Sequence, residues 1–341
     1  MANLQRGLQK NEDLSNIRRD ALWRVSTIAR MQYTRREFLR YAAAAAVPFA
    51  TGMRLDASSP APDLNRGQAV AIIPSTGEKL PRIGLGTYQI FDQLEPQHAA
   101  ALLGRFYALG GRLVDSSPMY GPAEEVTGTA SVAANINDKL FLATKVWTSG
   151  RERGVQQMQE SLAKLRRQRL ELMQIHNLVD WRTQLKTLRD YKERGIFKYI
   201  GLTHYSKSAF GELKKIIETE RIDFLQIPYS IAETTAAMGK GSLVETAARR
   251  QVAVIANEPF AQGRLFSSVR GRAVPPWAIE QGMTSWAQFF LKFILGDERV
   301  QFVIPATNKL QHLQDNMGAG VGDYPVASVR ARMQKEFLAT R

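Results

Sequence analysis

The chain contains no cysteine, and only four of its 341 residues are histidines. Without cysteine it cannot form a disulfide, a thiolate nucleophile, or a zinc or iron–sulfur centre held by cysteine ligands. The absence does not identify the redox compartment, because proteins without disulfides occur in both oxidising and reducing compartments. No metal site is predicted.

Long hydrophobic runs are also missing. The run 41–50, YAAAAAVPFA, is too short and too rich in alanine to span a bilayer. Hydrophobic residues make up 44% of the chain and charged residues 23%, which is ordinary for a soluble globular protein. These values indicate a folded domain without multiple membrane spans.

A glycine-rich dinucleotide fingerprint is missing as well. No Gly-x-Gly-x-x-Gly follows an early predicted strand, and Gly84-Leu85-Gly86 is too short to count as one. This argues against an open, doubly wound sheet of the kind that binds dinucleotides.

The charge is positive but thinly spread. The formal net charge is +14, and residues 1–56 carry ten Lys or Arg against five Asp or Glu, so +5 lies there and +9 over the remainder. The densest basic run, 164–169, ends a predicted helix, where cations favour the helix dipole. The pattern favours a solvated surface, and no nucleic-acid partner is predicted.

The N-terminal region resembles a twin-arginine export signal. Arg35 and Arg36 are followed by Phe38-Leu39, the alanine run and a stretch rich in Ser, Pro and Ala at 57–62. We therefore expect an exported, periplasmic or extracytoplasmic protein that uses the twin-arginine machinery. The alternative, an ordinary amphipathic helix with paired arginines, would leave the protein cytoplasmic.

The domain organisation follows from this signal. Met31 stands four residues before Arg35, so residues 1–30 are either an upstream over-read or an extended n-region. Residues 31–62 form the signal and linker, and residues 68–341 form the folded domain. No clean small-x-small cleavage site is present, so an uncleaved signal would act as a membrane tether.

Strand-like and helix-like runs alternate through the folded domain, after a hairpin at 70–73 and 79–82. The predicted strands are 83–87, 112–115, 140–145, 170–176, 199–203, 224–227, 252–256 and 302–304. The predicted helices are 96–109, 123–134, 151–167, 181–194, 207–219, 241–250, 284–295 and 309–317, with one more at 326–338. Eight such pairs predict a (β/α)8 barrel, with the hairpin as a plug at its N-terminal mouth.

Four titratable side chains lie at or just after the ends of three of these strands. Asp115 ends one strand and Tyr120 follows it, Lys145 ends the next, and His176 ends the third. In a barrel the carboxyl ends of the strands meet at one mouth, so we expect the four groups to lie together. A lysine ammonium beside a phenol lowers the phenol pKa, which suits Tyr120 to act as a general acid toward a carbonyl oxygen.

At this point the chain resembles the aldo-keto reductases, from about Ile83 to Asn316. The motifs Gly84-Leu-Gly-Thr, Asp115-x4-Tyr120-Gly, Lys145 and His176 occur in that family's order and spacing. The resemblance implies that the four residues are the catalytic tetrad and that a nicotinamide cofactor is held without a Rossmann domain.

The resemblance also implies cofactor-binding positions. Around the nicotinamide these are Thr203 and His204 in place of the usual Ser-Asn, Gln226, and Asn257 with Phe260 where a stacking tyrosine is common. At the adenosine end the implied residues are Thr307 and His312 near the phosphates and Asp315 and Asn316 on the adenine. Ala306 and His312 stand where the NADPH-preferring pattern has a lysine and an arginine that grip the 2′-phosphate. NADP(H) is expected over NAD(H), but these two positions do not decide the preference.

Tyr88, Trp147 and Asn177 are the predicted substrate-pocket residues, with Trp277 as a further aromatic from the loop 260–282. The predicted function is reversible, nicotinamide-dependent reduction of an aldehyde or ketone. Two alternatives stay open at this point. One is a non-catalytic, cofactor-bound barrel that senses redox state for a partner protein, and the other is an aldolase or isomerase that uses Lys145 as a Schiff base.

Overall fold

The computed structural model describes residues 67–340. The predicted export signal and residues 1–30 lie outside this range. Within it, eight parallel strands form one sheet in the order β10-β9-β8-β7-β6-β5-β4-β3. The strands are β3 (Leu85–Gly86), β4 (Leu113–Asp115), β5 (Phe141–Val146), β6 (Leu170–His176), β7 (Phe197–Thr203), β8 (Phe224–Pro228), β9 (Ala253–Asn257) and β10 (Phe302–Val303).

The sheet closes on itself between its first and last strands. Parallel bridges join Ile83 to Val303 and Gly86 to Ala306. A Cβ atom on Gly86 would lie 2.9 Å from the carbonyl oxygen of Ile304, so the closure needs a residue without a side chain at this point. The predicted (β/α)8 barrel is confirmed, and Gly86 serves strand packing in it.

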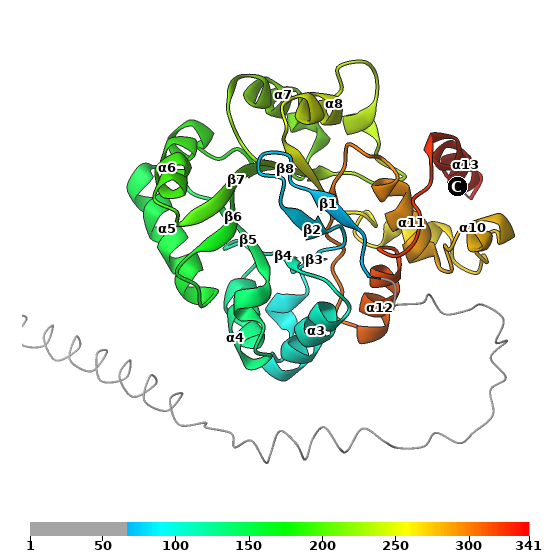
Figure 1. Cartoon of the computed structure of the whole chain (residues 1–341), viewed down its shortest axis with the longest axis horizontal. Coiled ribbons are helices and arrows are strands. Elements are labelled where there is room, and N and C mark those ends of the chain that lie inside the picture. The colour runs from blue at the N-terminus through cyan, green and yellow to red at the C-terminus, as the bar shows by residue number, and fades with distance from the viewer. Residues whose placement is uncertain (1–66, 341) are drawn as a thin grey trace, which may run out of the picture. The chain divides into compact units, whose positions relative to one another are not determined.

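Helices cover the outside of the barrel (Figure 1). They are α3 (Pro96–Ala108), α4 (Ala123–Ala133), α5 (Arg151–Lys164), α6 (Trp181–Glu193), α7 (Phe210–Thr219), α8 (Leu243–Arg249), α9 (Arg264–Ser268), α10 (Pro276–Glu280), α11 (Trp286–Leu295), α12 (Leu310–Gly318) and α13 (Ala327–Leu338). Their apolar faces and the outward side chains of the strands form the larger hydrophobic core. No helix within residues 67–340 is long and apolar enough to cross a membrane.

The N-terminal hairpin covers one mouth of the barrel, as predicted. Strands β1 (Val70–Ile72) and β2 (Lys79–Pro81) pair antiparallel and lie over the strands in Figure 1. The buried side chains of Ile73 and Leu80 join the inward-facing cluster of the barrel, and the Tyr199 hydroxyl lies 2.7 Å from Oγ1 of Thr76. The hairpin therefore closes the N-terminal mouth with both apolar and polar contacts.

Inward-facing side chains change character along the barrel axis, because alternate residues of each strand face the interior. The half next to the hairpin is apolar. Its inward cluster consists of Ile73, Leu80, Leu113, Phe141, Ala143, Leu172, Tyr199, Phe224, Ala253, Ile255, Phe302 and Ile304. Two residues further along, the same faces carry Lys145 on β5 and Gln174 and His176 on β6. The polar half thus lies at the carboxyl ends of the strands.

The structure differs from the sequence-based prediction mainly where helices begin and end. The helix predicted to reach residue 167 stops at Lys164, since Arg166 takes a left-handed conformation with φ of 57°. The helix predicted from residue 207 begins with a 3₁₀ turn, Lys207–Ala209. In the loop predicted for 260–282, the short helices α9 and α10 form. Such boundaries depend on tertiary contacts that local propensity does not encode.

Candidate active site

Lys145 and Asp115 form a buried ion pair at the centre of the polar half of the barrel. Lys145 Nζ donates to Oδ2 of Asp115 and to the carbonyl oxygen of Ser116, each at 2.6 Å. Burial acts to lower the pKa of Lys145, but Asp115 and Tyr120 beside it raise that pKa above its usual value. The ammonium is therefore held in its charged form inside the barrel.

The second carboxylate oxygen of Asp115 is also fully engaged. Oδ1 accepts hydrogen bonds from Nε2 of Gln226 at 2.8 Å and from Nε2 of Gln174 at 3.1 Å. Gln174 was missed by the sequence analysis. The sequence feature that could have identified it is its position two residues before His176 on the same strand, because strand residues two apart point to the same face.

Tyr120 lies beside this pair, at the end of the turn that follows β4. The ammonium of Lys145 lies 4.8 Å from the centre of its ring. Burial raises the pKa of Tyr120 above its ordinary value, and Lys145 opposes that rise without overcoming it. The expectation of a lowered pKa for the phenol was therefore wrong for the resting site, because partial burial penalises the phenolate more than one ammonium favours it. In the resting site Tyr120 is protonated.

His176 completes the group predicted from the strand ends. Its ring meets that of Tyr120 edge to face, with 5.9 Å between the ring centres. Burial lowers the pKa of His176 to about 3, and the nearby charge of Lys145 adds to the effect. The ring is neutral at physiological pH, so it can orient an oxygen by a hydrogen bond but does not carry a positive charge. Its Nδ1 lies 3.0 Å from Oγ of Ser117, another residue that the sequence analysis missed.

The residues implied for the nicotinamide lie around Gln226, next to Asp115. The side-chain oxygen of Gln226 accepts from Oγ1 of Thr203 at 3.1 Å and from Nδ2 of Asn257 at 3.4 Å. Nδ1 of His204 accepts from the Ser206 amide at 3.0 Å, which leaves Nε2 to carry the ring proton. Burial lowers the pKa of His204, so this ring too favours the neutral form.

The buried Oδ1 of Asn257 has no hydrogen-bond partner within residues 67–340. An unpaired acceptor at a strand end and the ring proton of His204 are the groups that a carboxamide requires. The residues at these strand ends therefore fit the amide of a nicotinamide. Phe260, the other residue implied there, packs against Phe266 with 4.9 Å between ring centres and contacts the main core.

A cavity of about 260 Å³ lies where the loops after β7, β8 and β9 meet. Lys207 and Arg264 line it, together with Glu233 and Glu258. Lys207 pairs with Glu233 at 3.3 Å, whereas Arg264 makes no ion pair with any described residue. The two cations suit the phosphates of a dinucleotide, and Glu258 opposes them.

The residues implied for the adenosine end lie on α12 and in the turn between β10 and α12. Thr307 is buried and its Oγ1 accepts from the Lys309 amide at 3.2 Å. On α12, His312 is exposed, Asn316 is buried, and Asp315 accepts from Nε2 of Gln288 at 2.8 Å. Within residues 67–340 no hydrogen bond or ion pair joins their side chains to Asp115, Tyr120, Lys145 or His176.

Two of the three predicted substrate residues are exposed aromatics. Tyr88 is 46% exposed with its ring 4.9 Å from that of Tyr120, and Trp147, directly after β5, is 42% exposed. Asn177 follows His176 in a left-handed conformation with φ of 54°. Trp277 instead packs on Phe289 at 6.1 Å between ring centres.

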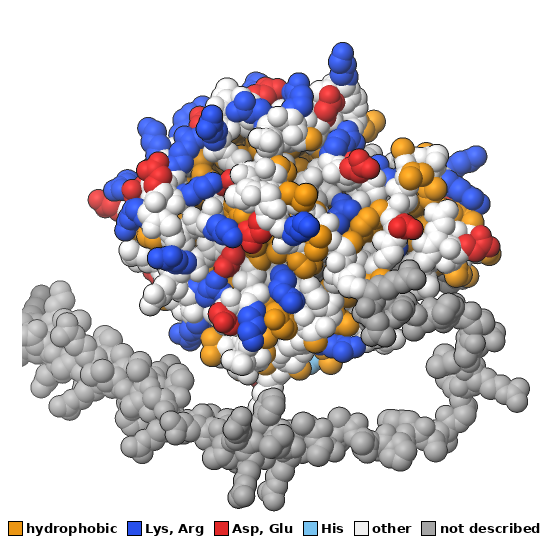
Figure 2. Space-filling view, in the orientation of Figure 1, with side chains coloured by type: hydrophobic (Ala, Val, Ile, Leu, Met, Phe, Trp, Pro, Cys, Tyr) orange, Lys and Arg blue, Asp and Glu red, His pale blue; other side chains and the backbone are white. Residues whose placement is uncertain are grey.

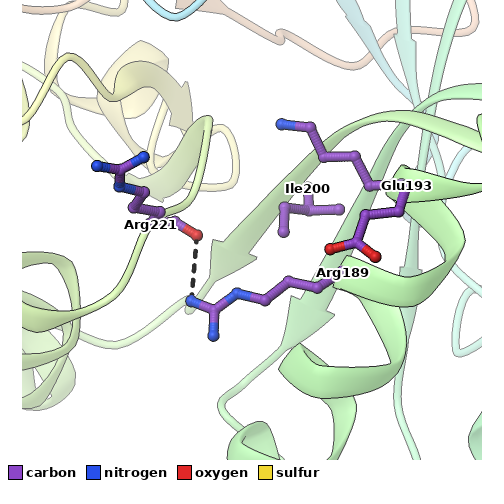
Figure 3. A pocket seen from close by; sticks show the side chains of 5 residues that line it. Arg189, Glu193, Ile200 and Arg221 are labelled. Carbon is purple, nitrogen blue, oxygen red and sulfur yellow. Dashed lines mark hydrogen bonds between the residues drawn. The ribbon is translucent and has the colours of Figure 1, made fainter.

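The larger cavity of about 370 Å³ lies elsewhere, between α6 and the segment before β8 (Figure 3). Arg189 there donates to the carbonyl oxygen of Arg221 and pairs with Glu220 at 2.6 Å. Lys192 on its rim pairs with Asp223 at 2.5 Å. Arg189 and Lys192 are thus already paired, and none of the predicted site residues lines this cavity, so it is not a candidate active site.

The hairpin-side surface also fails to suggest a polyanion site. Figure 2 shows Lys and Arg scattered over this face with Asp and Glu between them. Two arginines of the basic run 164–169 are paired, Arg166 with Glu125 at 3.3 Å and Arg167 with Glu171.

This geometry defines a class of protein. It is a (β/α)8 barrel that holds a buried lysine–aspartate pair, a tyrosine and a neutral histidine at its C-terminal mouth. Residues 82–331 match the family model of the aldo/keto reductase family. The chain belongs to that family.

Individual relatives are distant. The methylglyoxal reductase YeaE of Escherichia coli is 25% identical over 271 residues, which cover 77% of this chain and 93% of that protein. An aldo-keto reductase of Mycobacterium avium is 26% identical over 246 residues, covering 70% and 80%. Among solved structures, the aldo-keto reductase of Klebsiella pneumoniae in complex with NADPH superposes with a TM-score of 0.68 at 21% identity, covering 80% of this chain and 95% of that one. These structural likenesses support the fold.

Proposed function

We propose that the protein reduces an aldehyde or ketone to an alcohol, reversibly, with a nicotinamide cofactor. The observation that carries the proposal is the position of Tyr120, whose ring centre lies 4.8 Å from the ammonium of the buried Lys145–Asp115 pair. The same constellation at the strand ends is what the family resemblance implied. The bound cofactor supplies the hydride that the carbonyl carbon accepts.

Tyr120 donates its proton to the carbonyl oxygen as that oxygen gains negative charge. Lys145, 4.8 Å from the ring centre, stabilises the phenolate that remains. Asp115 holds the ammonium in place, and Gln174 and Gln226 hold Asp115. His176 is neutral, so its part is to orient the carbonyl oxygen.

The Schiff-base alternative requires an unprotonated Lys145 that can reach a substrate. Lys145 is fully buried, its ammonium has two acceptors at 2.6 Å, and its pKa is raised. A nucleophilic lysine needs the opposite conditions, so carbonyl reduction is favoured. The redox-sensing alternative needs no proton donor, so the grouping of Asp115, Tyr120, Lys145 and His176 at the strand ends disfavours it.

NADP(H) is the proposed cofactor. Support comes from solved relatives bound to NADPH or NADP, such as the Klebsiella pneumoniae protein and the Bombyx mori aldo-keto reductase, which is 20% identical over 80% of this chain and 93% of that one, with a TM-score of 0.64. Thr203, His204, Gln226 and Asn257 would hold the nicotinamide amide. Lys207 and Arg264 would face the phosphates.

The substrate is proposed to be a small carbonyl compound. Relatives named as methylglyoxal reductases make methylglyoxal the first compound to test. Tyr88, Trp147 and Asn177 lie near the mouth as the side chains that would contact it.

Fluorescence titration with NADPH and with NADH tests the cofactor assignment. Tight binding of NADPH supports it, and binding of neither cofactor would remove the reductase proposal.

Export is proposed separately, from Arg35 and Arg36 followed by Phe38-Leu39. In that proposal the protein folds before transport, and substituting both arginines by lysine keeps it in the cytoplasm. Unchanged export of that variant would exclude the twin-arginine route.

A further inference from the structure

Ser117 stands in the turn between β4 and Tyr120, fully buried. Its Oγ lies 3.0 Å from Nδ1 of His176, a residue 59 positions further along the chain. The same oxygen accepts a hydrogen bond from the Met119 amide at 3.3 Å. Within residues 67–340 the Ser117 hydroxyl has no other hydrogen-bond partner.

These contacts determine which atoms carry the protons. A hydroxyl has one hydrogen to donate and two lone pairs, and the Met119 amide already occupies one lone pair. If Nδ1 of His176 carried the ring proton, Ser117 would accept twice and its own buried hydrogen would have no acceptor. A buried donor without an acceptor destabilises the fold. With Nδ1 as the acceptor, both the Ser117 hydroxyl and Nδ1 of His176 are satisfied.

The other ring nitrogen is then the one that carries the proton. Nε2 of His176 has no hydrogen-bond partner among the described residues, and it is not sealed from solvent. The ring lies edge to face against Tyr120. A hydrogen-bond donor without a protein partner therefore lies next to the proposed general acid.

We propose that Ser117 is a positioning residue that donates to Nδ1 of His176, keeps the ring proton on Nε2, and so makes His176 a donor toward the substrate's carbonyl oxygen. This purpose rests on the proposed carbonyl reduction. The hydrogen bond itself exists whether or not that reaction is correct, so the two can be tested apart.

A purely structural role for Ser117 predicts something different. Removing its hydroxyl would then change stability but would leave the ring proton of His176 where it was. The tautomer of His176 is thus the observable that separates positioning from packing.

The test is nitrogen-15 NMR of the imidazole rings in the full-length protein, which has only four histidines. The His176→Asn variant assigns the signal by its loss. In the unmodified protein we expect an Nε2–H ring with an acceptor-type Nδ1, and Ser117→Ala should shift that Nδ1 signal and populate both tautomers. Ser116→Ala is the matched control, because it removes the neighbouring hydroxyl, which is bonded to Thr87, and should leave the tautomer unchanged.

Steady-state kinetics with NADPH and methylglyoxal provide the second readout. Ser117→Ala should lower kcat/KM by about tenfold, the size of one hydrogen bond to the reacting oxygen, with unchanged NADPH affinity. An Nδ1–H ring in the unmodified protein overturns the proposal, and so does a Ser117→Ala spectrum identical to that protein's. Absence of turnover in the unmodified protein would instead count against the reductase function, and the NMR result would still decide the tautomer.

Discussion

Lys145 Nζ lies 2.6 Å from Oδ2 of Asp115 inside the barrel, where the two side chains are 0% and 3% exposed. Neither charge has access to bulk water, so each depends on the other and on the amides around them. This dependence makes the pair both the electrostatic support of Tyr120 and a stability element that can be measured separately.

Substituting Lys145 by Met should destabilise the protein by about 3–5 kcal/mol, because Asp115 would stay buried without its counter-charge. Adding Asp115→Asn removes that stranded charge, so the double variant should regain most of the loss. Denaturant unfolding of the two single variants and the double variant measures the coupling. Strictly additive effects would show that the two charges do not depend on each other.

The ring of His176 should stay neutral across the physiological range. Its pKa is lowered to about 3, so the ring carries a proton only below that value, whereas the same ring in the unfolded chain is protonated below about 6.5. Between these values the unfolded chain binds the extra proton, and the contribution of His176 to stability is lost as pH falls from about 6.5 toward 3. An NMR titration of His176 should show no inflection near 6.5, and an inflection there would contradict the neutral ring.

Removing the negative charge of Glu258 should tighten cofactor binding. Glu258 lines the cavity with Lys207 and Arg264, where it would repel phosphates. At a half-buried position the expected gain is about two- to tenfold in Kd for NADPH, larger at low salt. Glu258→Gln keeps the shape and removes the charge, and Glu280→Gln on the exposed face of α10 serves as the control. Equal Kd values for all three proteins would place the phosphates elsewhere.

The hairpin should matter for stability and not for turnover. Leu80 is 4% exposed and packs into the barrel interior, so Leu80→Ala should cost about 2–4 kcal/mol. Ile72→Ala is the matched control on the same hairpin, at a residue that is 54% exposed, and should cost little. Because the hairpin lies at the opposite mouth, kcat of Leu80→Ala below its unfolding temperature should match that of the unmodified protein. A large fall in kcat would mean that the hairpin affects the strand-end site.

The barrel and the tetrad grouping could be predicted because both follow from local patterns. Strand 170–176 was predicted with the bounds that β6 has, since its apolar run ends sharply at His176. The alternation of strand faces then places Lys145 and His176 in the same interior. These are consequences of period-two geometry, which the sequence carries directly.

The partners of those groups were harder to predict. Gln174 and Ser117 carried no sequence signal of a partner, although they bond Asp115 and His176, each 59 residues away along the chain. The direction of the Tyr120 pKa was also mispredicted, because it depends on how deeply the fold buries the phenol. Long-range partners and burial arise from the closed barrel and not from local spacing.

The central claim is that Tyr120 delivers the proton in a nicotinamide-dependent carbonyl reduction. The most direct measurement is NADPH oxidation with methylglyoxal by the unmodified protein and by Tyr120→Phe, together with the NADPH Kd of each. Phenylalanine removes only the hydroxyl, so we predict that kcat falls by about 10²–10⁴-fold while the Kd stays within about twofold. Turnover of Tyr120→Phe at the rate of the unmodified protein would contradict the account.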